Sequence, residues 1–163
     1  MKSQFKSKKE VVYDQLRQEI LEGVHQPGSR LVIDDLATRL EISQNPIREA
    51  MRELEANGFV TIVPHVGATI ANLDASFIYE VFAMLEAMEV ISSRGACQVI
   101  TDEEVNKLEV MISEMDHSVD DPNLWSQQNK AFHLYTCDIA KTQLVRKMML
   151  KLFDHWDRLR FHY

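Results

Sequence analysis

The chain has 163 residues, of which 45% are hydrophobic, and its formal net charge at pH 7 is −7. This length predicts one large or two small domains with ample apolar material for a core. The acidic balance excludes bulk affinity for nucleic acid, although a specific binder needs only a local basic patch. No window approaches 18 apolar residues, and the basic N-terminus lacks an apolar segment, so we expect neither a membrane span nor a secretory signal.

The N-terminal region predicts a short tail and a bracing helix. Residues 1–8 are interpreted as a flexible basic tail. Ser7 and Glu10 have the spacing of a capping box that opens a helix. Apolar residues then recur every four positions and predict its buried face: Val12, Leu16, Ile20 and Val24.

Residues 34–55 predict two short helices joined by a tight turn. The first has an apolar face of Leu36, Ala37 and Leu40, and the second has one of Ile47, Ala50, Met51 and Leu54. Either Ser43 or Asn45 can cap the second helix. A helix-turn-helix of this kind can place its second helix in the DNA major groove, but the spacing alone also fits a helix pair that only forms a core.

A hairpin follows the second helix. Asn57-Gly58 ends the helix, because glycine tolerates the left-handed conformation. Two β-branched runs, Val60–Val63 and Ala68–Ala71, flank residues 64–67 and predict a two-stranded wing.

At this point the sequence resembles the winged-helix domain of GntR-family transcription regulators. The resemblance covers residues 9–73, and its most specific segment is Ser43-Gln-Asn-Pro-Ile-Arg-Glu-Ala50. Gln44 stands where the family usually has Arg, and Glu41 stands where it usually has Gly. Val63 and Val66 replace wing positions that are often basic.

The predicted DNA contacts lie on the second helix, on the wing and near them. Guanidinium groups suit phosphate and guanine, and amides suit adenine. His65 is either a phosphate or minor-groove contact or a turn residue. The full set is Arg30, Arg39, Ser43, Gln44, Asn45, Arg48, Arg52, His65 and Gly67.

From residue 74 onward, the pattern is helical and predicts an antiparallel bundle. Four helices are expected over residues 77–99, from a capping box at Thr101, over 124–140 and over 144–161. The second should have an apolar face of Val105, Leu108, Val110, Met111 and Met115. Cys97 and Cys137 lie in apolar patterns and are predicted to be buried thiols, which suits a reducing cytoplasm.

Residues 74–163 resemble part of the FCD-type C-terminal domain of the FadR subfamily. The resemblance rests on Tyr79-Glu-Val-Phe-Ala-Met-Leu-Glu-Ala87, the Thr101 opening and Asn129-Lys-Ala-Phe-His133. The family often has Arg where Phe82 stands, and Asp where Asn129 stands. It usually continues for two more helices, so the domain is interpreted as partial.

The resemblance implies an effector site at Asn129 and His133. In the family, the Asp and His of the third bundle helix bind a divalent metal, together with two later His residues. His133 is therefore either a metal ligand beside Asn129 or a lone helical histidine. We expect zinc, nickel or manganese only if the C-terminal domain is completed, and no certain cofactor otherwise.

The sequence thus predicts a mostly α protein: an N-terminal winged helix-turn-helix with a β-hairpin wing, followed by an antiparallel helical bundle. The preferred function is that of a ligand-responsive transcription regulator in the cytoplasm, with repression the favoured mode. It would bind a pseudo-palindromic double-stranded DNA operator as a homodimer and respond to a small organic acid. The alternatives are a winged-helix protein-interaction module, or a metal-binding helical protein with a vestigial DNA-binding domain. No catalytic constellation is present, so no enzyme is predicted.

Overall fold

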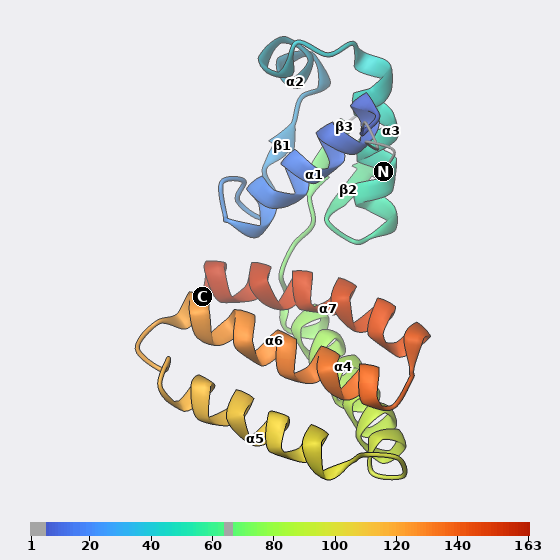
Figure 1. The fold of residues 1–163 in the computed structure, drawn as a ribbon. Helices are drawn as coiled ribbons and strands as arrows, with labels where there is room; N and C mark the ends of the chain where they lie inside the picture. The colour runs from blue at the N-terminus through green and yellow to red at the C-terminus, as the bar shows by residue number, and fades with distance from the viewer. Residues whose placement is uncertain (1–5, 64–66) are drawn as a thin grey trace. The chain divides into compact units, whose positions relative to one another are not determined.

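The computed structural model describes residues 6–63 and 67–163 and has ten elements, seven of them helices, over that part of the chain (Figure 1). The chain divides into two compact units. One comprises residues up to Asp74 with Arg158–Tyr163, and the other comprises Ala75–Asp157. The predicted mostly α fold with a small antiparallel sheet is confirmed. Within the described ranges, no helix is long and apolar enough to cross a membrane.

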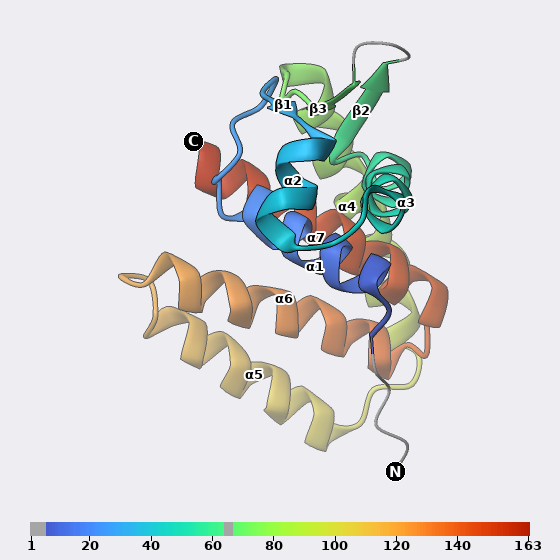
Figure 2. The ribbon, with the colours of Figure 1, turned by 90° about the horizontal axis from the view of Figure 1, so that it is seen from above.

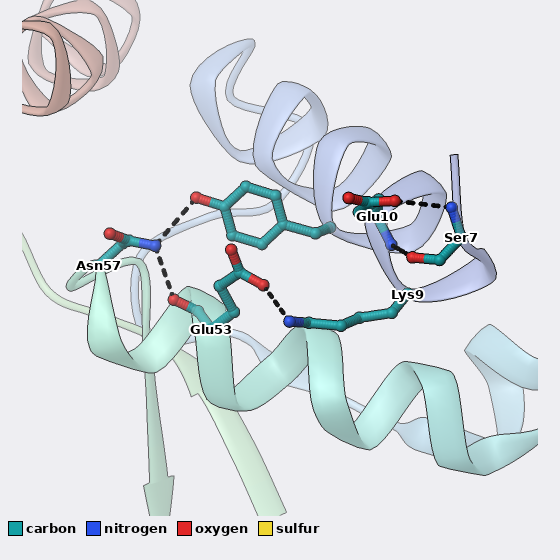
Figure 3. Close-up of polar contacts among 6 residues, drawn as sticks. Ser7, Lys9, Glu10, Glu53 and Asn57 are labelled. Atoms are coloured by element: carbon teal, nitrogen blue, oxygen red, sulfur yellow. Dashed lines mark hydrogen bonds and ion pairs between the residues drawn. The ribbon is translucent and has the colours of Figure 1, made fainter. Parts of the chain in front are cut away.

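Helix α1 (Lys8–Leu21) begins with the predicted capping box. The Ser7 hydroxyl accepts a hydrogen bond from the Glu10 amide at 3.2 Å, and the Glu10 carboxylate accepts one from the Ser7 amide at 2.7 Å (Figure 3). The expected buried face is confirmed at its first three positions, but Val24 is 60% exposed. It lies beyond the end of the helix, where Gly23 turns the chain with φ +71°.

The predicted helix-turn-helix consists of α2 (Ile33–Leu40) and α3 (Gln44–Ala56). All four predicted apolar residues of the second helix are buried: Ile47, Ala50, Met51 and Leu54. The turn between the helices passes through Glu41, whose φ of 54° is left-handed. Because a side chain at Cβ crowds this conformation, the residue costs about 1 kcal/mol relative to glycine.

Helix α1 packs against α3, and polar contacts fix their relative position (Figure 3). Lys9 Nζ lies 2.7 Å from Glu53 Oε2. Asn57, which ends α3, donates to the Tyr13 hydroxyl at 3.1 Å and to the Glu53 carbonyl at 2.9 Å. These contacts hold α1 behind α3 and leave the opposite face of α3 free.

The sheet contains β1 (Arg30–Leu31), β2 (Val60–Val63) and β3 (Gly67–Ile70) in the order β1-β3-β2, all antiparallel. Strand β2 lies beside α3 (Figure 2). The predicted hairpin is present, with Val60 opposite Ile70 and Val63 opposite Gly67. The sequence did not predict β1, because two residues are too few to show an alternating pattern.

The second unit is built from α4 (Ala75–Ala96), α5 (Asp102–Asp116), α6 (Pro122–Ile139) and most of α7 (Gln143–His162). The Thr101 capping box is present. Asp121 caps α6 by accepting from the amides of Asn123 and Leu124 at 3.1 and 3.0 Å. Helices α5 and α6 lie side by side (Figures 1 and 2).

The core of this unit lies between α4, α6 and α7, where Val81, Leu85, Cys137, Met149 and Phe153 are buried. Two predictions were wrong. No residue of α5 is buried, and Val110 is 56% exposed, so its apolar face is only partly covered. Cys97 is exposed and lies directly after the end of α4 at Ala96.

Candidate DNA-binding interface and effector cavity

The outward face of α3 carries the polar residues that the sequence predicted to contact DNA. Gln44, Asn45, Arg48 and Arg52 are all exposed, because the opposite face of the helix is buried against the core. Arg48 and Arg52 are one helical turn apart and therefore lie on the same side. The structure brings these four predicted residues together on one surface.

Hydrogen bonds orient two of these side chains. Gln44 Nε2 donates to the carboxylate of Asp34 on α2, and Gln44 Oε1 accepts from Arg48 Nη2 at 3.1 Å. The chain Asp34–Gln44–Arg48 therefore positions the Arg48 guanidinium. Sequence reasoning missed Asp34, since no helical spacing relates residues on opposite sides of a turn.

The N-terminus of α3 has no side-chain cap. Ser43 occupies the N-cap position, but its side chain makes no capping hydrogen bond, and the first turn has no acidic residue. Asn45 lies inside the helix, so of the two predicted caps only Ser43 occupies the N-cap position, and it does so without a capping hydrogen bond. An uncapped helix N-terminus presents backbone N–H groups and a partial positive charge, which suit a phosphate.

Arg30 and Gly67 meet at the base of the wing. The Gly67 backbone has a φ of +111°, and a Cβ placed there would lie 3.4 Å from Arg30 Nε. Glycine therefore permits both the backbone conformation and the position of the guanidinium. His65, the third predicted wing residue, lies outside the described residues.

Arg39 is held in an ionic cluster with α1. Its Nη2 and the Nε2 of His25 each lie 2.8 Å from Oε2 of Glu19. Burial raises the pKa of Glu19, but the hydrogen bonds from Arg39 and His25 outweigh it and hold that pKa below its ordinary value. The Arg39 side chain remains 45% exposed, so part of its guanidinium faces solvent.

The second unit contains a cavity of about 220 Å³, which we call the aromatic cavity. Both predicted effector residues, Asn129 and His133, line it. Phe82 and Trp156 meet in its wall edge to face, with ring centroids 5.3 Å apart. The lining comprises Phe82, Leu85, Glu86, Glu89, Trp125, Asn129, His133, Phe153 and Trp156.

Two carboxylates line this cavity, and sequence reasoning missed both. Glu86 and Glu89 follow Phe82 on α4 at helical spacing, so a helical projection from Phe82 would have found them. His133 Nδ1 lies 3.4 Å from Glu89 Oε1. Burial lowers the pKa of His133, and Glu89 opposes this with a smaller raising effect.

The metal site implied by the sequence resemblance does not fit these donors. Among the described residues, no group of three or more His, Cys, Asp or Glu side chains is arranged to hold a metal ion. Asn129 contributes only a neutral amide, and His133 directs one ring nitrogen at Glu89.

Two family patterns match the chain and together cover most of it. "Bacterial regulatory proteins, gntR family" matches residues 8–70, and "FCD domain" matches residues 80–163. The boundary between the matches falls close to the division between the two structural units.

Three curated relatives are regulators. The Nta operon transcriptional regulator of Aminobacter aminovorans is 33% identical over 92 residues, which is 56% of this chain and 44% of the relative. The uncharacterized HTH-type transcriptional regulator YdhC of Bacillus subtilis is 26% identical, with 87% and 65% covered. The HTH-type transcriptional repressor RspR of Escherichia coli is 25% identical, with 92% and 67% covered. The chain thus spans about two thirds or less of the length of these relatives.

Solved structures share the fold. A putative transcriptional regulator GntR from Rhodococcus sp. RHA1 superposes with a TM-score of 0.70 at 22% identity, covering 96% of this chain and 75% of that one. E. coli McbR/YncC superposes with a TM-score of 0.65 at 19% identity, covering 92% and 72%. Taken with the two family matches, the chain belongs to the GntR family of bacterial regulatory proteins and carries an FCD domain, and this family is one of regulators and not of enzymes.

Proposed function

We propose that the chain is a transcription regulator that binds a pseudo-palindromic DNA operator through α3 and the wing. The observation that supports this most directly is the exposed polar face of α3, where Gln44, Asn45, Arg48 and Arg52 project together. The face has the size and chemistry of a recognition helix in a major groove. The proposal places its action in the bacterial cytoplasm, where the chromosome lies.

Each part of this surface has a role in the proposal. Arg48, positioned through Gln44 and Asp34, contacts a guanine edge or a phosphate. Arg52, one turn further on, contacts a phosphate. The backbone N–H groups at the uncapped N-terminus of α3, next to Ser43, donate to another phosphate. Arg30 supplies a cation at the base of the wing.

A gel-shift titration with genomic fragments, including the DNA that flanks the gene, tests this function. We expect a discrete complex on one fragment whose affinity falls steeply with salt, because phosphate contacts release counterions. A protein-interaction module would bind no fragment above the level of random DNA. That result would refute the proposal.

We propose a homodimer, because one winged helix reads too few base pairs for a genomic address. The surface that suits self-association is a stripe on α4 in which Glu80, Ala87 and Arg94 recur every seven residues. Met84, Val90 and Ile91 flank the stripe and are 44%, 43% and 53% exposed. Seven-residue spacing is typical of a helix-to-helix seam.

The charges of this stripe favour an antiparallel pairing. With Ala87 on the two-fold axis, Glu80 of each copy lies level with Arg94 of the other copy. Symmetry therefore gives two such pairs, and both are attractive. A parallel pairing would oppose like charges. Within the described residues, neither Glu80 nor Arg94 forms an ion pair, so both are available.

We propose that the second unit binds a small-molecule effector in the aromatic cavity.

We also propose that the chain holds no structural metal. An amide and one histidine on a single helix are fewer ligands than zinc takes. Elemental analysis of protein purified without chelator should find less than one zinc, nickel or manganese per chain. Stoichiometric metal that is lost in His133→Ala would contradict this.

A further inference from the structure

The walls of the aromatic cavity combine two kinds of group that attract the same kind of ligand. Phe82, Trp125, Phe153 and Trp156 contribute aromatic rings. Aromatic faces carry partial negative charge and attract cations, most strongly when the site is shielded from water. Glu86 and Glu89 add two carboxylates to the same lining.

No lysine or arginine in the described lining balances these carboxylates. Among the described residues that line the cavity, none is Lys or Arg, and His133 is the only other titratable side chain. The nearby Lys130 is bound to Asp157 and does not line the cavity.

An organic acid is therefore poorly matched to this site. A carboxylate ligand would face the carboxylates of Glu86 and Glu89, with no Lys or Arg in the lining to pair with. This conflicts with the organic acid that the sequence resemblance implies. Phe82 stands where the family often has Arg, and it contributes an aromatic ring and no cation to the lining.

We propose that the aromatic cavity binds a small organic cation, a primary amine or a quaternary ammonium compound, with the aromatic rings around its apolar part and Glu86 and Glu89 beside its charge. This rests on the proposed function, since it names the chemical class of the effector. Asn129 can accept a hydrogen bond from a protonated amine through its amide oxygen.

The chain contains a built-in reporter for this proposal. It has two tryptophans, Trp125 and Trp156, and both line the cavity. Intrinsic tryptophan fluorescence therefore reports on this site without a label. Phenethylamine, 2-phenylethanol and phenylacetate are suitable probes, since they share one ring and differ in charge; tetramethylammonium tests the quaternary class.

The full chain should show a saturable fluorescence change with phenethylamine or tetramethylammonium, and at least about tenfold weaker binding of phenylacetate. Glu86→Gln and Glu89→Gln preserve shape and remove charge, so each should weaken the binding of the cation about tenfold. Phe82→Arg should abolish it and favour phenylacetate. Glu109→Gln on α5, an exposed glutamate outside the cavity, is the matched control and should change nothing.

The proposal is overturned if phenylacetate binds as tightly as phenethylamine, or if neither cation gives a saturable change at millimolar concentration. It is also overturned if cation binding survives both glutamate substitutions in a protein whose circular dichroism is unchanged. Gel shifts on the same samples distinguish failure of this effector proposal from failure of the proposed DNA-binding function. DNA binding without cation binding removes only the effector class, whereas cation binding without DNA binding removes only the regulator.

Discussion

Single residues decide how the α3 surface is presented. Gln44 stands where the family usually has Arg, and the structure shows what this residue does: it links Asp34 on α2 to Arg48 on α3. One amide thus accepts and donates at once and restrains a guanidinium that would otherwise sample several rotamers. Arg48 is presented to solvent already oriented, which lowers the entropy lost on binding.

Arg48→Ala should weaken operator binding by about 1–3 kcal/mol, because it removes an oriented contact to a base edge or phosphate. Fluorescence anisotropy with a labelled operator measures this change. Lys147→Ala on α7 removes the same charge from an exposed position and is the control. Unchanged affinity in folded Arg48→Ala would remove this residue from the interface.

Glu41→Gly should raise the free energy of unfolding by about 1 kcal/mol, because Glu41 is left-handed and glycine adopts that conformation without strain. Urea denaturation measures the change. Glu49→Gly, the same substitution at an exposed position inside α3, should instead lower stability by about 1 kcal/mol. Equal effects at the two sites would show that the backbone at Glu41 is not strained.

At the scale of elements, the first unit is held together by cross-connections as well as by its core. Helix α1 contacts α3 through Lys9–Glu53 and Asn57–Tyr13. It contacts α2 through Glu19–Arg39. These three connections join α1 to both helices of the helix-turn-helix and leave the outward face of α3 exposed.

Glu19→Ala should lower the free energy of unfolding at pH 7 by about 1–3 kcal/mol, because it leaves Arg39 and His25 without their shared acceptor. The pKa of Glu19 is lower in the folded protein than in the unfolded chain. Its contribution is therefore complete above the unfolded pKa and is lost as the pH falls through the folded pKa.

Urea titrations at pH 7 and at about pH 3 test this, since the unfolded glutamate titrates near pH 4.3. The difference in the free energy of unfolding between the wild type and Glu19→Ala should be smaller at about pH 3 than at pH 7. Glu114→Ala, at an exposed position on α5, should show no such dependence. A difference that stays constant with pH would contradict the ionic role of Glu19.

The elements that the sequence predicted best are those whose signals are local. The capping boxes at Ser7 and Thr101 each involve residues three apart, and the apolar face of α3 repeats within one helix. The features that the sequence did not predict depend on contacts between residues that are distant in the sequence. Strand β1 exists only because β3 pairs with it, and the exposure of α5 depends on how few neighbours cover it.

The same distinction applies to the site. The polar face of α3 follows from helical spacing, so Gln44, Arg48 and Arg52 were predictable. Asp34 and the Arg39–Glu19 pair join different helices, and no spacing rule reveals them. The aromatic cavity likewise forms only where α4, α6 and α7 meet, although both of its carboxylates lie on α4.

For the whole molecule, the proposed dimer would connect the two units to one function. Each unit has its own core, so an interface on α4 can set the number of winged helices without altering the fold of either unit. In the proposed dimer, the stripe of Glu80, Ala87 and Arg94 would favour the antiparallel orientation of the two α4 helices. Its charge pattern permits a test by exchange of charges.

Glu80→Arg and Arg94→Glu should each raise the dimer dissociation constant about tenfold, because each turns two attractive pairs into repulsive ones. The double substitution restores the attraction and should restore the dimer. Sedimentation equilibrium measures all four proteins. If the double variant is no more dimeric than the single ones, the antiparallel α4 interface is wrong.

The central claim is that two copies of this chain read one operator through α3. Sedimentation of the full chain with a genomic duplex selected by the protein measures how many chains bind one duplex. A second duplex with one half-site scrambled shows whether the affinity depends on both half-sites. We expect two chains on the intact duplex, and a loss of affinity of at least about tenfold when one half-site is scrambled. One chain per duplex, or equal affinity for the intact and scrambled DNA, would contradict the account.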